Sequence, residues 1–439
     1  MYKLWNWVVG GVLLSPALLA ATTSLTPVEY GIDRSNMGTQ WELSWPSEPQ
    51  RSPFLSSEYN EPGNFQARRV AVLDGIAKLH PRWFRDGFGK GPADLFVDLV
   101  EQVHTRGMKL LAVFGPVGSD FPQAAFLTPQ QSGCQWGTHA LSKIDLESYR
   151  KRIESQFEAV RAAHETVDAF EVGNELDLYC NDADDPTPAE WARHQWHWFL
   201  TPAQVQAFVG GYAPFLAVSV ASIRKYFPDA RIITFGVSMP AAAPLIRALA
   251  SVKGASGEVV DYTKLVDGYG VHIYPTSDTT LNMVNGASAS LVSEAEIFPN
   301  SRDKPLWITE WNVSGSSFWN GRPWYFQYSA SGQPGGDLNK ADDRGIYKAM
   351  NRAEAIRVFE RDVVERLRTA KGSPVNIGYV LYYSYDSAAK STKCDASGFN
   401  QSHVALRGVC VDGVIDPTTG KLLPDVASAV VNAAHQEGP

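Results

Sequence analysis

The sequence has few cysteines and lacks the common cofactor and nucleic-acid signatures. Its four cysteines are Cys134, Cys180, Cys394 and Cys410, and no two of them have the C-x-x-C spacing of a zinc site. It has no P-loop and no GxGxxG fingerprint, so nucleotide binding is not indicated. The formal net charge is −8 and there is no basic patch, which argues against a nucleic-acid partner. We therefore expect no metal, no cofactor and no nucleic acid.

The composition is that of an ordinary globular protein. Of the 439 residues, 44% are hydrophobic and 20% are charged. This length accommodates one large domain or two smaller ones. We find no internal repeat and no clear linker, so we predict a single domain over residues 22–439, and we expect it to be a monomer.

The N-terminus resembles a secretory signal. Lys3 gives a short positive region, and the segment Trp7–Ala20 is mostly apolar and is followed by small residues. We predict a signal peptide over residues 1–21 and a secreted or periplasmic protein with no membrane span after cleavage. Leu18 or Leu19 falls where a small residue is preferred, so a retained membrane anchor is the alternative, although the apolar run is short for a span.

Short apolar runs alternate with segments of helical spacing along the chain. The expected strands are 28–32, 83–87, 109–114, 169–175, 231–237, 266–274, 306–308 and 377–383. The expected helices are 65–79, 94–105, 146–164, 202–226, 241–249, 281–297, 344–369 and 424–434. Eight strand–helix units in strict alternation predict an α/β fold, specifically a (β/α)8 TIM barrel with long loops on its C-terminal face. A doubly wound open sheet is the alternative, but it would lack its nucleotide fingerprint here.

Two of the expected strands end on a carboxylate. The run Leu306–Ile308 leads into Glu310, and the strand that begins at Ala169 ends in Asn174 and Glu175. A charged group at the end of a buried strand is costly unless it is paired or functional. The two glutamates are 310 − 175 = 135 residues apart, so only the fold can bring them together. Two carboxyl groups that face each other across a sugar ring are the catalytic groups of most glycoside hydrolases.

A barrel places further polar side chains beside this pair, because active sites of TIM barrels lie at the C-terminal ends of the strands. The residues at such ends are Arg85, Glu175, His272, Tyr274, Glu310 and Tyr383. The long loops after the third, fourth and seventh strands emerge on the same face. These loops and strand ends are where we expect substrate to bind.

The positions of the four cysteines in the loops of this face indicate how they pair. Cys134 and Cys180 lie in adjacent loops of that face, and Cys394 and Cys410 share one loop. We therefore expect the disulfides Cys134–Cys180 and Cys394–Cys410, which export would permit. Four unpaired buried thiols are the alternative.

At these strand ends the sequence resembles the clan A retaining glycoside hydrolases, which are (β/α)8 barrels with Asn-Glu ending strand four and Glu ending strand seven. The segments Trp307–Ser314 and Val271–Pro275 look most like family 39, the xylosidase- and iduronidase-like group, and in size like its compact exopolysaccharide-hydrolase members. The segment Gly173–Leu176 departs from that family, in which Trp precedes and Pro follows the Asn-Glu pair. The Gly is closer to heparanase-like members of the clan.

The resemblance implies that Glu310 is the nucleophile and Glu175 the acid/base of a double displacement. Retention requires the two carboxyl groups to be about 5–5.5 Å apart. Asn174 would bind the sugar 2-hydroxyl, and Arg85 would keep Glu310 ionised.

Further substrate contacts are expected from residues around this pair. His272 would line the sugar pocket, and Tyr274 would hydrogen-bond the nucleophile. Aromatic rings stack on sugar faces, so we add Trp311, Tyr383, Trp136 and Trp191 as expected substrate-binding residues.

The abundance of aromatic residues in the long loops suggests a polysaccharide or oligosaccharide substrate. A carbohydrate-binding barrel without catalysis is one alternative, although intact Glu175 and Glu310 argue against it. A transglycosylase would use the same residues, because it differs only in whether water or a sugar accepts the glycosyl group.

Overall fold

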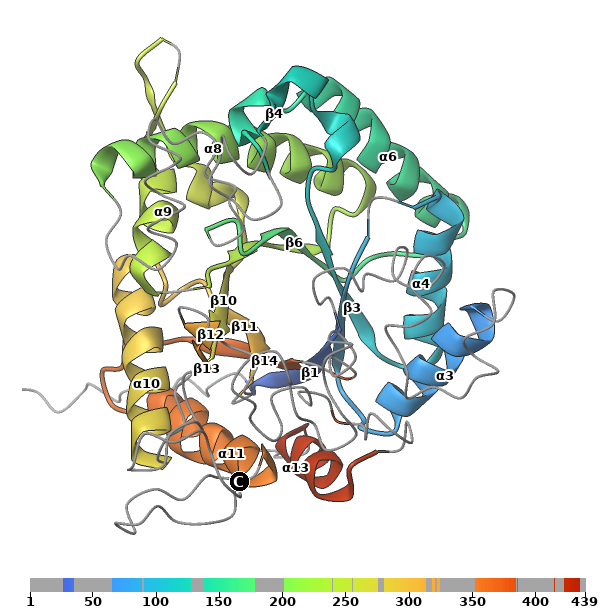
Figure 1. Cartoon of the computed structure of the whole chain (residues 1–439), viewed down its shortest axis with the longest axis vertical. Helices are drawn as coiled ribbons and strands as arrows, with labels where there is room; N and C mark the ends of the chain where they lie inside the picture. The colour runs from blue at the N-terminus through green and yellow to red at the C-terminus, as the bar shows by residue number, and fades with distance from the viewer. Residues whose placement is uncertain are drawn as a thin grey trace, which may run out of the picture.

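Eight parallel strands form a closed ring at the centre of the molecule (Figure 1). The computed structural model describes residues 27–34, 65–88, 91–127, 138–177, 201–238, 240–254, 256–274, 280–312, 318–319, 322–323, 352–383, 385, 414 and 422–434. The strands are β1 (Glu29–Asp33), β2 (Trp83–Gly87), β3 (Lys109–Phe114), β6 (Ala169–Asn174), β7 (Arg231–Gly236), β10 (Tyr269–Ile273), β11 (Leu306–Trp311) and β14 (Ile377–Tyr383).

The ring follows the order of the chain. Hydrogen-bonded neighbours run β10–β11–β14–β1–β2–β3–β6–β7. The bridges Val237↔Val271 and Ile233↔Gly268 join the remaining two edges, β7 and β10. Closure leaves no unpaired sheet edge, and it brings the C-terminal ends of all eight strands to one rim.

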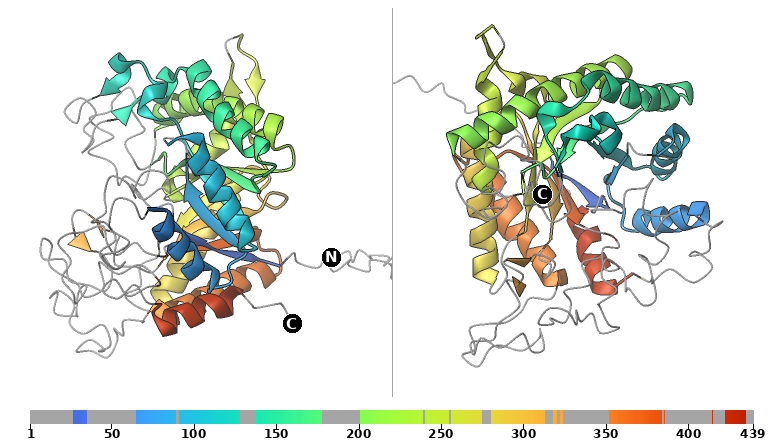
Figure 2. Two further views of the ribbon diagram at one scale, coloured as in Figure 1. Left: turned by 90° about the vertical axis from the view of Figure 1, so that its right-hand side faces the viewer. Right: turned by 45° about the horizontal axis from the view of Figure 1, so that its top comes forward.

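Helices cover the outside of the ring (Figures 1 and 2). They are α3 (Phe65–Ala77), α4 (Ala93–Thr105), α6 (Leu146–Ala162), α8 (Pro202–Tyr226), α9 (Ala243–Ala248), α10 (Thr280–Ile297), α11 (Arg352–Val358), α12 (Arg366–Thr369) and α13 (Pro424–Ala434). Strands and helices alternate along the chain, which confirms the predicted (β/α)8 barrel. The predicted boundaries agree within a few residues.

Two details of the sequence-based prediction differ from the structure. The expected helix 344–369 is not uniform, because a π-helical segment, Phe359–Glu365, separates α11 from α12. Its first eight residues lie outside the described part of the chain. Three short hairpins were also not predicted: β4–β5 (Phe126–Leu127 and Thr138–His139), β8–β9 (Val252–Lys253 and Val259–Val260) and β12–β13 (Phe318–Trp319 and Arg322–Pro323).

Local sequence explains where several helices begin and end. Thr201 accepts a hydrogen bond from the Gln204 amide, and the Gln204 side chain returns one to the Thr201 amide, which makes a capping box before Pro202 at the first helical position. Asp145 is a simple N-cap of α6, and its carboxylate accepts hydrogen bonds from the amides of Glu147 and Ser148. These caps fix the directions in which the two helices leave the barrel rim.

The longest helix, α8, has the length and apolar character that a membrane span would need, but 61% of its most apolar window is buried within the protein. Its residues Tyr212, Phe215 and Leu216 are fully buried in the core. In the described part of the chain this helix is therefore a core element of the barrel wall.

Large side chains fill the N-terminal half of the barrel interior. Trp83, Trp307 and Tyr379 pack against one another, with ring centroids 5.2 Å apart for the two tryptophans and 3.4 Å apart for Trp307 and Tyr379. Leu111, Ala169, Ile233 and Leu381 complete this layer. The fully buried charged side chains of the barrel, among them Arg85 and Glu171, lie on the C-terminal side of this layer.

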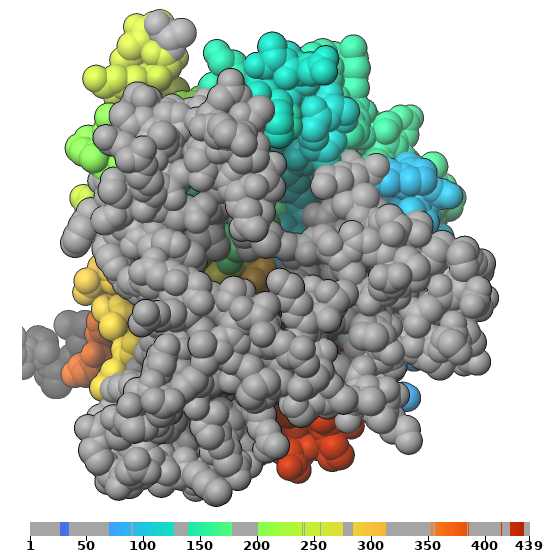
Figure 3. Space-filling view, viewed as in Figure 1, coloured from blue at the N-terminus to red at the C-terminus, as the bar shows by residue number. Residues whose placement is uncertain are grey.

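The space-filling view along the barrel shows α13 and the segment from β4 to α6 at opposite edges of one face (Figure 3). The predicted signal peptide and all four cysteines lie outside the described residues. The signal peptide, the single-domain boundary and both disulfide pairings therefore remain predictions.

Candidate active site

Glu310 lies near the end of β11, where the strand is irregular. The parallel register with β10 pairs Val271 with Ile308 and then His272 with Glu310, so Thr309 is an extra residue opposite that step. Bulges of this kind occur at barrel rims and redirect side chains. Here the bulge brings both Thr309 and Glu310 to the barrel interior, where Glu310 is only 5% exposed.

Glu175 follows β6 in an unusual backbone conformation. Its φ is +42°, in the left-handed region, and Gly173 two residues earlier has a φ of +97°. A side chain at position 173 would also collide with Leu176, since a Cβ there would lie 2.7 Å from Leu176 Cδ1. The turn therefore requires Gly where family 39 has Trp, and it directs the carboxylate of Glu175 into the barrel mouth.

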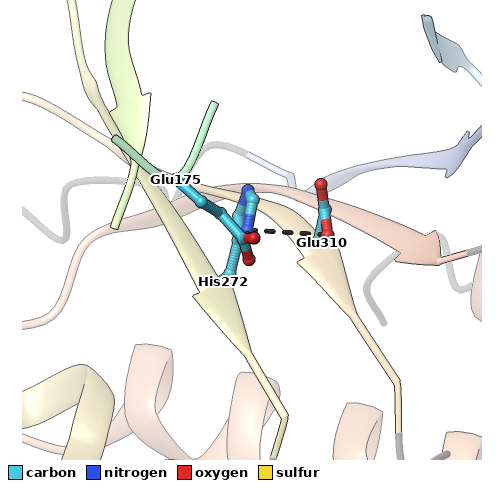
Figure 4. A group of neighbouring side chains, drawn as sticks. All are labelled: Glu175, His272 and Glu310. Atoms are coloured by element: carbon cyan, nitrogen blue, oxygen red, sulfur yellow. Dashed lines mark hydrogen bonds and ion pairs between the residues drawn. The ribbon is translucent and has the colours of Figure 1, made fainter. Parts of the chain in front are cut away.

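His272 lies between the two glutamates (Figure 4). Its Nδ1 is 2.7 Å from Glu175 Oε1 and 3.5 Å from Glu310 Oε2. The contacting atoms of these three side chains all lie within 4.8 Å of one another. The sequence placed the three residues on one rim, and the structure brings them into direct contact.

Arg85, which is fully buried on β2, connects Glu310 to β6. Its Nη1 donates to Glu310 Oε1 at 2.7 Å, and its Nη2 donates to Asn174 Oδ1 at 2.6 Å. Nη1 also lies 3.1 Å from Asp33 Oδ1. The expected charge-assisted bond between Arg85 and Glu310 is therefore present, and it also holds Asn174 beside the two glutamates.

Tyr274 contacts the other oxygen of Glu310. Its hydroxyl donates to Glu310 Oε2 at 2.6 Å, as the sequence predicted. Tyr383, at the end of β14, lies beside it with ring centroids 5.9 Å apart and the two planes nearly perpendicular. Both rings thus lie at the rim next to Glu310. Tyr385, two residues beyond Tyr383, lies away from Glu310, because its hydroxyl packs against Gly75 of α3.

The electrostatics of the site follow from burial and opposite charges. Burial disfavours the imidazolium of His272, but the carboxylates of Glu310, Glu175 and Glu171 outweigh it and raise the pKa of His272 to about 10. Burial also raises the pKa of Glu310 to about 7, although His272 and Arg85 act in the opposite direction. His272 is therefore positively charged at neutral pH, whereas Glu310 changes its protonation state near pH 7.

The spacing of Glu175, His272 and Glu310 would also suit a metal ion. Two features of the site oppose this. An imidazolium cannot ligate a cation, and the raised pKa of His272 keeps it protonated at neutral pH. Arg85 places a second positive charge 2.7 Å from Glu310. The arrangement is suited to proton transfer rather than to metal binding.

One predicted substrate contact is corrected by the structure. Trp311 is 1% exposed, and its ring stacks on Phe359 with centroids 4.0 Å apart. It points from β11 into the helix layer, on the opposite side of the strand from Glu310, because successive strand residues face opposite sides. Trp311 is a core residue and does not form a sugar platform. Trp136 and Trp191 lie outside the described residues, so their predicted roles stay predictions.

Sequence reasoning missed three polar residues of the site. Glu171 is completely buried on β6 and accepts a bond from Arg85 Nε at 2.7 Å. Thr309 Oγ1 donates to Glu171 at 3.3 Å, and Asp33 lies against Arg85. A charged residue inside the apolar run Ala169–Val172 was a usable signal, because such a charge needs a buried partner.

The fold and this site define a TIM barrel with a buried pair of carboxylates at its C-terminal rim. No protein-family model matches the sequence, and no curated protein sequence is similar to it. Among solved structures, the GH1 β-glucosidase from Exiguobacterium antarcticum B7 is similar, with a TM-score of 0.52 and 13% identity over 94% of this chain and 99% of that chain.

A polyextremophilic β-galactosidase from the Antarctic haloarchaeon Halorubrum lacusprofundi is also similar, with a TM-score of 0.50 and 12% identity. The match covers 93% of this chain and 58% of the galactosidase. At these identities the likeness establishes the (β/α)8 fold, and the function has to be argued from the site.

Proposed function

We propose that this protein is a secreted retaining glycoside hydrolase that cleaves a polysaccharide or oligosaccharide, with Glu310 as nucleophile and Glu175 as acid/base. One observation carries the proposal. An oxygen of Glu175 and an oxygen of Glu310 lie within 4.8 Å of each other at the rim where TIM barrels hold their active sites. Two carboxyl groups about 5–5.5 Å apart are typical of retention, whereas inversion needs about 6.5–9.5 Å to admit a water.

The contacts of Glu310 suit a nucleophile. Arg85 and Tyr274 each donate a hydrogen bond to a different carboxylate oxygen, at 2.7 and 2.6 Å. Both bonds favour the ionised form and fix the plane of the carboxylate. Attack of Glu310 on the anomeric carbon forms a glycosyl-enzyme, and the leaving oxygen takes its proton from Glu175.

The contacts of Glu175 suit a group that exchanges a proton. Its Oε1 lies 2.7 Å from His272 Nδ1, so a proton can be shared between them. When Glu310 loses its charge in the glycosyl-enzyme, His272 and Glu175 lose a negative neighbour. Glu175 is then more readily ionised and can activate the water that releases the sugar.

The rest of the rim supports a sugar substrate. Asn174 is held by Arg85 beside both glutamates, where it would bind the 2-hydroxyl of the ring at the cleavage point. The two similar solved structures are named for β-glucosidase and β-galactosidase activity, which favours a β-glycoside. The family 39 likeness of Trp307–Ser314 and the secretion signal remain part of this proposal.

A product screen tests the proposal. The secreted form is incubated with a panel of β-linked polysaccharides and aryl β-glycosides, and Glu310→Gln serves as the matched blank because it keeps the shape of the nucleophile. We expect sugar release from the wild type, with the β configuration at early times by NMR. Added acceptor alcohol separates hydrolysis from transglycosylation. Initial release of the α-anomer would contradict retention, and equal release by the Glu310→Gln variant would contradict the nucleophile assignment.

A further inference from the structure

Glu171 is a third buried carboxylate below the two proposed catalytic glutamates. It has no exposed surface, and it lies four residues before Glu175 on β6. Its Oε2 accepts from Arg85 Nε at 2.7 Å, and its Oε1 accepts from the Gly236 amide at 2.7 Å. The Thr309 hydroxyl donates to the same Oε1 at 3.3 Å. Bonds from β2, β7 and β11 thus fix this carboxylate in one orientation.

The two cations of the site both lie against Glu171. Arg85 bonds to it through Nε, and the same guanidinium bonds Glu310 and Asn174 through its two other nitrogens. His272 directs Nε2 toward Glu171 Oε1 at 3.8 Å, while its Nδ1 contacts Glu175 at 2.7 Å. Glu171 therefore reaches the nucleophile through Arg85 and the acid/base through His272.

We propose that Glu171 is the positioning residue of this site. It holds Arg85 in register with Glu310 through a hydrogen bond, and its negative charge, 3.8 Å from Nε2, keeps His272 positively charged so that Nδ1 shares a proton with Glu175. The proposal rests on the proposed hydrolase function for its catalytic consequence. Its structural part concerns the charge and orientation of Arg85 and His272, which can be measured without any substrate.

Packing around Gly236 supports this role. A Cβ at position 236 would lie 2.1 Å from His272 Nε2 and 2.9 Å from Glu171 Oε1. The glycine therefore lets the imidazole and the carboxylate approach each other on the inner side of β7. A larger residue there would push His272 away from its position between Glu171 and Glu175.

The charges around His272 show in which direction its pKa should change when Glu171 is replaced. The titratable groups around His272 are Glu171 from β6, Glu175 after it, Glu310 from β11 and Glu294 from α10. Burial raises the pKa of Glu294 well above its usual range, and Asp33 and Arg85 lie beyond the other groups on β1 and β2. Arg85 holds the pKa of Glu171 below its usual range in spite of complete burial. Because ionised Glu171 stabilises the imidazolium, removing its charge must lower the pKa of His272.

The experiment compares wild type, Glu171→Asp and Glu171→Gln by NMR titration of the His272 imidazole, with His272→Asn to assign the signal. We expect the pKa of His272 to fall in the order wild type, Asp, Gln, with a decrease of at least about one pH unit for Gln. Thr309→Val is the matched control, since it removes one contact of Glu171 and leaves its charge in place. It should leave the His272 titration where it is in the wild type.

A kinetic measurement with an aryl glycoside tests the catalytic consequence. In Glu171→Gln we expect kcat to fall at least about tenfold with KM nearly unchanged, because the groups affected act on the reacting carboxylates. A His272 titration that is the same in wild type and in both Glu171 variants would overturn the positioning role. If Glu171→Gln does not fold, the titration of Glu171→Asp alone tests the proposal. The shorter side chain places the negative charge farther from His272, so the pKa of His272 must still decrease. An inactive wild type would instead refute the proposed function and leave the titration interpretable.

Discussion

At the residue scale the site is a balance of four carboxylates against two cations. Asp33, Glu171 and Glu310 surround Arg85, and Glu171, Glu175 and Glu310 surround His272. Each cation is shared between carboxylates from different strands. Removing one member leaves its partners buried with uncompensated charge, which is more costly than leaving the whole group intact.

The first residue-scale prediction concerns Glu175→Ala. With an aryl glycoside whose leaving group needs no protonation, formation of the glycosyl-enzyme should proceed, and its hydrolysis should slow by about 10²–10⁴-fold because the general base is lost. Azide should restore turnover by attacking the glycosyl-enzyme.

Anomeric analysis of the glycosyl azide checks the assignment. A β-configured product is expected, since two inversions retain configuration. An α-configured azide would move the nucleophile role to Glu175.

The second prediction concerns pH. As the proposed nucleophile, Glu310 must be ionised to attack, and burial raises its pKa to about 7. We therefore expect kcat/KM to fall as the pH decreases through about 7 and to level off above it. The measurement from pH 5 to 9 uses an aryl glycoside whose leaving group needs no protonation, so that the protonation of Glu175 does not limit the rate. Tyr274→Phe removes a donor that favours the ionised carboxylate, so its acidic limb should move to higher pH. An acidic limb below pH 5 in both proteins would contradict the environment assigned to Glu310.

At the element scale, strand irregularity decides which residues reach the site. In β11 the extra residue at Thr309 lets Thr309 and Glu310 both face inward, and Trp311 then faces the helix layer. At the end of β6, the left-handed conformations of Gly173 and Glu175 turn the Glu175 carboxylate into the barrel mouth. Strict alternation along a regular strand would not place these side chains as observed.

A second feature at this scale lies away from the site, where α4 meets the segment between α6 and β6. His104 Nδ1 contacts Glu165 at 2.8 Å and Nε2 contacts Asp168 at 2.9 Å. Bonding a carboxylate at each nitrogen requires the doubly protonated ring. The bond to Asp168 is the main cause of the raised pKa of His104.

This contact predicts pH-dependent stability. A raised folded-state pKa means that the stabilisation is complete below the unfolded value of about 6.5 and is lost as the pH rises through the folded value. His104→Gln should therefore reduce the free energy of unfolding by about 1 kcal/mol at pH 6 and by less at pH 9, as measured by urea unfolding. Glu165→Gln alone and the double variant complete a mutant cycle. An equal loss at both pH values would show that His104 acts by packing alone.

At the scale of the whole molecule, the residues that fill the N-terminal half of the barrel and stabilise it are separate from the charged residues of the candidate site. Trp83, Trp307 and Tyr379 form a layer with no charged member, and the site lies on the opposite side of it. The closed ring of strands then holds side chains from β1, β2, β6, β10 and β11 at fixed separations. Rigid strands of this kind position catalytic groups better than loops do.

This separation predicts a large stability cost for a change in the layer. Trp307→Ala should reduce the free energy of unfolding by about 3–5 kcal/mol, because it leaves a cavity among buried rings. Trp307→Phe, which keeps most of the volume, should cost roughly 1–3 kcal/mol. Urea unfolding of the two variants beside the wild type measures both. A change below about 1 kcal/mol in the Ala variant would mean that the barrel collapses around the missing ring.

The sequence by itself determined the fold class and most element boundaries, and it marked Glu175 and Glu310 as candidates, because strand and helix periodicity and a carboxylate at the end of an apolar run are local properties. Their contact through His272 is a result of the tertiary structure. The sequence also indicated Arg85, His272 and Tyr274, since barrel topology puts strand ends on one rim. The tertiary structure alone decided that Trp311 turns outward and that Glu171 joins Arg85 to His272. Those facts depend on strand register and on contacts between residues far apart in the chain, and no local pattern encodes either of them.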